Sequence, residues 1–168
     1  KNDFNLAISN IDQSIELFNL AEHSRFETQM LIDKLNIIIE CGNIDDVASI
    51  ISKIEYLINK LKGTYSNFLF TAAKLYLNSK KGIVNIDELH SLYESLEETG
   101  DNFPLNFPLI YWYIAKAYYQ INQMGRAREC HEKAKQIIYC LAEQIKGEKN
   151  KETFYKTYFH KRILDNLS

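Results

Sequence analysis

Histidine and cysteine, the residue types that most often bind zinc, are few in this chain and are scattered along it. Zinc sites need histidine and cysteine ligands at short, regular spacings such as HExxH or CxxC, and neither arrangement occurs. The four histidines lie in different predicted helices or turns, at His23, His90, His131 and His160. The sequence therefore predicts no metal site.

Cys130 and His131 are neighbours, which suggests a nucleophile and its base. Adjacent side chains on a helix point about 100° apart, so the two cannot readily act together. We interpret His131 as a packed histidine. Cys41, Cys130 and Cys140 form an odd set without a CxxC pair, which is typical of reduced thiols in a cytoplasmic protein, and we expect them in the core.

Glu94, Glu97 and Glu98 group near the end of one predicted helix. Paired carboxylates can serve as general acid and base, but on a helix end such a group is typical of a solvated face. There is also no Walker-type loop and no GxGxxG fingerprint. We therefore predict that the chain is not an enzyme and binds no cofactor.

The composition suits a helical protein. Only two prolines and six glycines occur in 168 residues, which leaves room for long helices. The formal net charge of −2 gives no general attraction to nucleic acid or to membrane surfaces, and no stretch approaches the roughly 20 apolar residues that span a bilayer. Because the sequence begins without methionine, we expect it to be a segment of a longer protein.

Apolar residues recur at helical spacing along the whole chain, with glycines between the periodic segments. Asn85 is the expected N-cap of one helix, and Pro108 suits the first turn of another. The pattern predicts an all-α fold of about eight helices. Their expected ranges are 3–21, 24–41, 44–62, 65–79, 86–98, 108–121, 124–145 and 151–166.

A helical hairpin with small residues at its crossing is predicted from Leu109 to Lys135. Tyr111, Ile114, Ala115 and Tyr118 lie in its first helix, Ala127 and Ala134 in its second, and Asn122 in the turn. These residues fall at the signature positions of a tetratricopeptide repeat, which the segment resembles. Leu35 and Ala72 fall at the position of Ala115 in two degenerate units.

The resemblance implies an α-solenoid of stacked hairpins in a single domain, residues 1–168. Its units would span about 24–62, 64–98 and 106–146, with a flanking helix at 3–21 and a capping helix at 151–166. The tail from Phe154 to Leu167 also looks like the end of repeat regions in large bacterial sensor and signalling ATPase proteins.

In tetratricopeptide proteins the first helix of each unit lines a concave groove, so the resemblance implies a partner-binding groove here. Trp112, Lys116 and Tyr119 combine aromatic area with a charge, as peptide-binding hot spots do. Aromatic stripes at helical spacing are also typical of a core, or of packing against another domain or copy. The implied groove residues are Gln29, Ile32, Asn36, Ser66, Leu69, Tyr76, Leu109, Trp112, Lys116, Tyr119 and Gln120.

The predicted function is a protein–protein interaction scaffold. It would serve as an adaptor or regulatory segment of a cytoplasmic signalling protein, and would bind a peptide or a neighbouring domain. An RNA-binding helical repeat and an oligomerisation segment are the alternatives. RNA binding favours a basic groove, whereas the implied groove contains a single lysine, so we expect neither a nucleic-acid nor a membrane partner.

Overall fold

The computed structural model describes residues 4–42, 47–61, 64–99, 105–165 and 167, with residues 64–67 described by their backbone alone. Within these ranges the regular structure consists of nine α-helices and no strand, so the predicted all-α class is confirmed. The helices are α1 (Phe4–Leu20), α2 (Ser24–Cys41), α3 (Val47–Leu61), α4 (Thr64–Lys80), α5 (Ile86–Glu97), α6 (Phe107–Gln120), α7 (Met124–Glu143), α8 (Glu148–Tyr155) and α9 (Tyr158–Asp165).

The largest departure from the predicted helices lies at the C-terminus. The sequence pattern predicts one capping helix at 151–166, but the structure has two short helices, α8 and α9, separated at Lys156 and Thr157. The helix count of about eight was therefore too low for the described residues. No proline or glycine stands at this break, so the local sequence gave no sign of it.

The chain divides into two units, residues 1–70 (unit 1) and 71–168 (unit 2). The boundary falls inside α4, and not between the predicted repeat units. The single domain expected from the sequence stays a prediction, and each unit is described by itself below.

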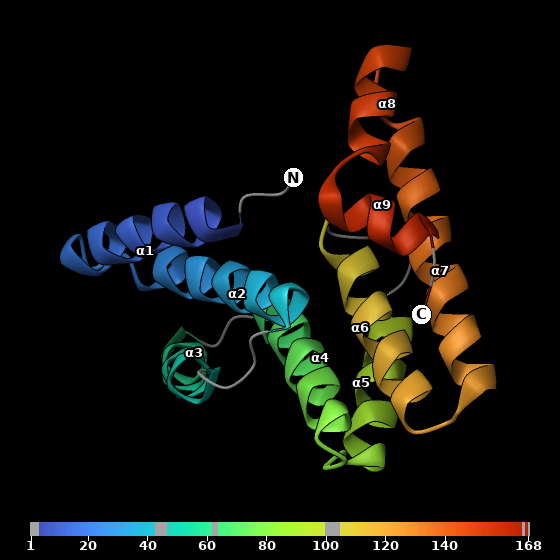
Figure 1. Cartoon of the computed structure of the whole chain (residues 1–168), viewed down its shortest axis with the longest axis horizontal. Helices are drawn as coiled ribbons and strands as arrows, with labels where there is room; N and C mark the ends of the chain where they lie inside the picture. The colour runs from blue at the N-terminus through green and yellow to red at the C-terminus, as the bar shows by residue number, and fades with distance from the viewer. Residues whose placement is uncertain (1–3, 43–46, 62–63, 100–104, 166, 168) are drawn as a thin grey trace. The chain divides into compact units, whose positions relative to one another are not determined.

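In unit 1, α1 and α2 form a helical hairpin, and α3 packs against α2 (Figure 1). Phe18 stacks on Phe26 across the hairpin with ring centroids 5.2 Å apart, and Lys34 Nζ lies 2.6 Å from Asp12 Oδ1. No residue of α1 is fully buried, and its Leu17 is exposed. The core of unit 1 therefore comes mainly from α2 and α3.

A buried carboxylate joins α2 to α3. Glu27 lies in the first turn of α2 and is buried, and its Oε1 lies 2.6 Å from the Nζ of Lys53 on α3. A buried charge is tolerated only when it is paired or hydrogen-bonded. Lys53 thus compensates for the burial of Glu27.

Replacing Lys53 by methionine is expected to lower the free energy of unfolding by about 1–2 kcal/mol, because the Glu27 charge then stays buried without its cation. Urea unfolding followed by circular dichroism measures this loss. Lys60→Met is the matched control on the exposed side of α3, with an expected change below about 0.5 kcal/mol. Equal losses in the two variants would show that the ion pair does not matter.

In unit 2, α6 and α7 form a hairpin, with α5 against α6, α8 against α7, and α9 against both α6 and α7 (Figure 1). The side chain of Asn85 accepts a hydrogen bond from the Glu88 N–H at 3.2 Å, so the predicted N-cap of α5 is confirmed. Pro108 lies in the first turn of α6, also as predicted.

Several helices end at a residue with a left-handed backbone. Gly42, Gly82 and Asn122 have φ of 77°, 71° and 61°, and their positions are evenly spaced along the chain at 42, 82 and 122. A left-handed residue after the last helical turn is a common helix stop, and asparagine tolerates it better than most residues. The turn before α7 contains Asn122, as the sequence predicts, and Gly125 lies inside α7, within the predicted range 124–145. Gly63 and Gly100 lie outside the described residues.

The turns after α1, α4 and α6 share one hydrogen-bond pattern. In each, the N–H that follows the left-handed residue donates to the carbonyl five residues back at 2.9 Å: His23 to Phe18, Ile83 to Asn78 and Gln123 to Tyr118. This bond belongs to the Schellman helix stop. The same backbone turn therefore recurs along the chain although its residue types differ.

Candidate functional site

Helix α6 carries a continuous buried core. From Phe107 to Tyr118, every side chain is buried except Leu109 and Lys116, which are half-buried. The sequence predicts that a helix apolar on nearly every side needs cover on several faces, and the structure confirms it. Trp112 is only 1% exposed, so its ring offers almost no surface to a partner.

The three evenly spaced left-handed residues, Gly42, Gly82 and Asn122, provide common reference points for aligning the sequences of α2, α4 and α6. Leu35, Leu75 and Ala115 each precede such a residue by seven positions, and all three are fully buried. The sequence frame places Ala72, and not Leu75, at this position, a difference of about one helical turn. In the register set by the left-handed residues, Ser66 has no groove position, and Lys80 is the equivalent of Gln120.

The groove residues predicted in unit 1 are mostly inaccessible. Ile32, Asn36 and Leu69 are buried, and the side chain of Ser66 lies outside the described part of the chain. Gln29 is half-buried, and its Nε2 donates to Asp33 Oδ1 at 3.0 Å. Burial raises the pKa of the Asp33 carboxyl, and the bond from Gln29 partly offsets this. A partner can therefore reach little of the predicted set in this unit.

In unit 2, two lysines lie over buried aromatic rings. Lys116 Nζ is 4.1 Å from the centroid of the Trp112 ring and 5.1 Å from that of Tyr76, and Lys80 Nζ is 5.4 Å from the Tyr76 centroid. The Tyr76 ring stacks on Tyr113 with centroids 5.7 Å apart. Cation–π contacts of this kind contribute about 0.5–2 kcal/mol each. They hold the lysine stems over the aromatic core.

Past these rings, α6 reaches the surface. Tyr119 is 36% exposed, Gln120 is exposed, and Lys80 is exposed at the end of α4. We name Lys80, Lys116, Tyr119 and Gln120 the α4–α6 face. The α4–α6 face retains the charged and partly aromatic surface of the predicted groove. Tyr76 and Trp112 are buried beneath this surface.

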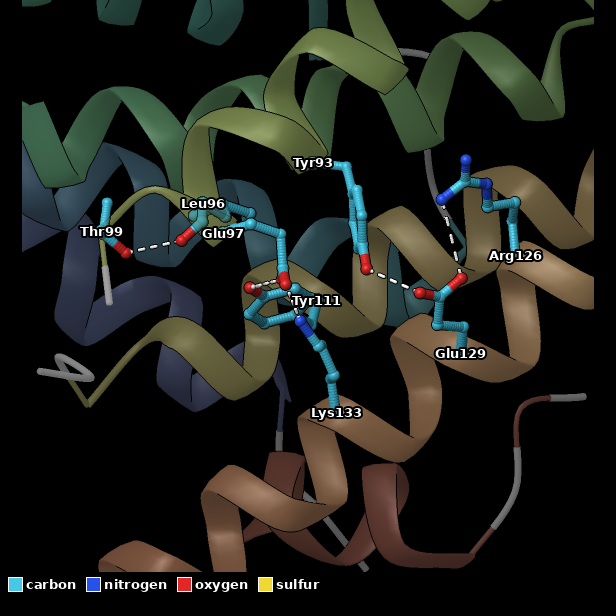
Figure 2. Close-up of polar contacts among 8 residues, drawn as sticks. All are labelled: Tyr93, Leu96, Glu97, Thr99, Tyr111, Arg126, Glu129 and Lys133. Atoms are coloured by element: carbon cyan, nitrogen blue, oxygen red, sulfur yellow. Dashed lines mark hydrogen bonds and ion pairs between the residues drawn. The ribbon is translucent and has the colours of Figure 1, made fainter. Parts of the chain in front are cut away.

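A second polar cluster joins α5, α6 and α7 (Figure 2). The Tyr93 hydroxyl donates to Glu129 Oε1 at 2.9 Å, and the Tyr111 hydroxyl donates to Glu97 Oε1 at 2.7 Å. Lys133 pairs with Glu97, and Arg126 lies 3.7 Å from Glu129. Figure 2 shows that these side chains converge between the three helices.

Glu94, Glu97 and Glu98 are all exposed, as predicted for a solvated face. Glu97 also binds two partners, Tyr111 and Lys133, which the sequence did not indicate. Partial burial alone would raise the pKa of the Glu97 carboxyl, yet the bonds from Lys133 and Tyr111 hold it below its usual value. Burial and the nearby carboxylates raise the pKa of Tyr93 and of Tyr111, so both phenols stay protonated donors. The cluster therefore joins helices and does no evident acid–base work.

The three cysteines differ in their exposure to solvent. Cys130 is fully buried, and burial, with the nearby Glu129 carboxylate, raises the pKa of its thiol to about 12. Because the thiolate is the reactive form, Cys130 is inert at neutral pH. Cys41 and Cys140 are free thiols on the surface, so the expectation of core cysteines holds only for Cys130.

His131 is a packed histidine, as predicted. It is buried on α7, and its Nε2 lies 2.6 Å from the carbonyl oxygen of Ile163 on α9. That carbonyl is in the last turn of α9, where the helix itself provides no donor. The imidazole N–H therefore satisfies a helix end.

The His131 contact predicts a pH dependence of stability. Burial lowers the pKa of His131 below its usual value, although the bond to Ile163 opposes this. The unfolded chain therefore takes up the proton first, and the contribution of His131 is complete above about pH 6.5 and is lost as the pH falls below it. Urea unfolding between about pH 7 and pH 5 should show a smaller loss in His131→Gln than in the natural chain. Identical pH profiles would contradict the assignment.

Other kinds of site find no support in the described residues. No group of three or more histidine, cysteine, aspartate or glutamate side chains there could hold a metal ion. No helix in the same part of the chain is long and apolar enough to cross a membrane. Comparison with protein-family models, curated proteins and solved structures finds no match.

Proposed function

We propose that the chain is a protein-interaction scaffold of tetratricopeptide-like hairpins that binds a peptide at the α4–α6 face. Its main support is the pair of lysines, Lys80 and Lys116, which lie over the Tyr76 ring. The exposed Tyr119 follows Lys116 by three positions on α6. Aromatic and cationic side chains on one helix face are typical of peptide-binding hot spots.

Two features support the tetratricopeptide-like part of the proposal. The signature residues of the two helices are all buried, and α6 packs against α7: Tyr111, Ile114, Ala115 and Tyr118 of α6, with Ala127 and Ala134 of α7. Three of the left-handed residues, at positions 42, 82 and 122, also recur at an even spacing, as expected of stacked hairpins. Their spacing, from 42 to 82 to 122, exceeds the tetratricopeptide period of about 34 residues, so the units would be long variants.

The charge of the face sets the class of peptide. Two ammonium groups near one ring attract carboxylates, and Tyr119 adds apolar area with a hydroxyl at its edge. The expected ligand is an acidic peptide that carries an apolar or aromatic residue. RNA binding has no comparable support, because the formal net charge is −2 and the described surface offers no aromatic platform larger than Tyr119 on this face.

Selection from a displayed library of random peptides tests the proposal. Peptides enriched on the natural chain should contain Asp or Glu, and should bind Lys80→Glu/Lys116→Glu about ten-fold or more weakly. The matched control, Lys146→Glu/Lys149→Glu, makes the same change of charge at exposed positions after α7 and should bind as the natural chain does. Circular dichroism checks that both variants fold. Equal binding by both variants would place the ligand elsewhere and reject the α4–α6 face.

A further inference from the structure

Helix α9 is a short element near the C-terminus of unit 2 that packs on α6 and α7. It has eight residues, and Ile163 is its one fully buried side chain. Its best-defined polar contact to α7 is the bond between His131 and the Ile163 carbonyl. Helices this short are not stable alone in water, so α9 depends on the surface beneath it.

The surface beneath α9 belongs to α6 and α7, as Figure 1 also shows. Ile163 and its carbonyl meet this surface through groups that every copy of the chain carries, His131 included. The α9 of a second copy would therefore make the same contacts. Only the connection between α8 and α9 decides which copy provides the helix.

That connection is a bend held by local side-chain contacts. The Phe154 carbonyl accepts the Thr157 hydroxyl at 3.0 Å and lies 2.9 Å from His160 Nδ1, while the rings of Phe154 and His160 are 4.2 Å apart. Lys156, at the end of α8, already has a right-handed helical backbone, with φ −83° and ψ −5°. Neither proline nor glycine fixes the bend.

The sequence across the bend has the pattern of one helix. Phe154, Tyr155, Phe159 and Ile163 recur at helical spacing, which is why the sequence predicts a single helix at 151–166. In a continuous helix the Phe154 carbonyl would accept the N–H of Tyr158 in place of its present partners. On straightening, the two side-chain bonds to the Phe154 carbonyl are lost and this backbone bond is gained, so the two forms differ by one hydrogen bond at this carbonyl.

We propose that α8 and α9 join into one continuous helix and that α9 then docks on the α6–α7 surface of a second copy of this chain. The result is a dimer formed by exchange of α9, with His131 of each copy bonded to Ile163 of the other. Exchange of a terminal element through a short hinge is a known route to dimers. The proposal does not depend on the α4–α6 face.

The first test changes the hinge. Lys156→Ala/Thr157→Ala favours a continuous helix and removes the Thr157 hydroxyl bond that holds the bend. Size-exclusion chromatography with light scattering over a concentration series should show a dimer whose dissociation constant is lower than that of the natural chain by about ten-fold or more. A double variant that remains monomeric at every concentration would overturn the proposal.

The second test blocks straightening and leaves the bent form intact. Tyr158 is the first residue of α9, where proline is well tolerated, but it would lie mid-helix in the straight form, where proline is strongly disfavoured. Tyr158→Pro, placed in the Lys156→Ala/Thr157→Ala background, should therefore abolish the dimer. Tyr158→Ala in the same background controls for loss of the ring and should retain it. Equal dimer fractions in the two would contradict a straightened hinge.

The third test removes the anchor. Ile163→Asp in the same background places a charge at the buried site of both copies, so the dimer should disappear. Lys161→Asp, at an exposed position of α9, is its control and should leave the dimer. A dimer that persists with Ile163→Asp forms through another surface, which would reject exchange of α9.

Discussion

Replacing Trp112 by alanine is expected to lower the free energy of unfolding by about 3–5 kcal/mol. The indole is 1% exposed and contacts the Tyr113 ring, with centroids 5.7 Å apart, and the Lys116 ammonium group. Its removal leaves a large cavity and deprives Lys116 of its aromatic support. Urea unfolding monitored by circular dichroism measures the loss.

Tyr139→Ala is the control for Trp112→Ala. Tyr139 is also a large aromatic residue of unit 2, but it is 51% exposed on α7, and its removal should cost about 1 kcal/mol or less. Similar small losses in both variants would mean that Trp112 is not part of the core. A large loss from Trp112→Ala alone would show that this substitution tests stability and not partner binding.

Enlarging Ala134 to leucine should lower the free energy of unfolding by up to about 3 kcal/mol. Ala134 is fully buried on α7, the helix that packs against α6, and the added atoms have no space unless the two backbones separate. Thermal unfolding should show a lower midpoint. The substitution tests whether the small residues of the tetratricopeptide pattern are needed for close helix packing.

Gln136→Leu introduces the same leucine side chain at an exposed position of α7, with little change in size, and serves as the control for Ala134→Leu. It should change stability by about 0.5 kcal/mol or less. If both substitutions were tolerated equally, α6 and α7 would not require a small residue at their crossing. The tetratricopeptide resemblance would then lose its main packing argument.

The helices could be predicted because local rules place them. Apolar spacing gives the course of each helix, Asn85 marks the start of α5, and Pro108 marks the first turn of α6. Each of these signals acts within a few residues and does not depend on distant partners. The all-α class follows from them alone.

The packing of α9 on α7 depends on contacts that the local pattern does not contain. His131 is 32 residues from Ile163 in the sequence, and its bond to that carbonyl forms only when α9 lies against α7. The polar cluster was missed for the same reason, since Tyr93 and Glu129 are 36 residues apart. The residue types at these positions are equally compatible with solvent exposure.

The candidate site was predicted in part. Lys116 and Tyr119 are accessible, whereas the aromatic character of Trp112 and Tyr76 did not distinguish a binding surface from a core. The alignment of α2, α4 and α6 does distinguish a core position from a surface position. Trp112 is the equivalent of Ile32 and Ala72, and both of these are buried. Glycine spacing alone does not give this register, because a residue other than glycine, Asn122, makes the turn after α6.

Two of the three thiols are exposed to solvent and one is buried, so spectroscopic labels can be attached at two defined cysteines. Maleimide reagents attack thiolates at the surface, so Cys41 and Cys140 should react while Cys130 is spared. The two reactive sites fall one in each unit, since residue 41 precedes the boundary in α4 and residue 140 follows it. A donor and an acceptor dye at these sites would turn the natural sequence, without any substitution, into a sensor for movement between its halves when a peptide binds.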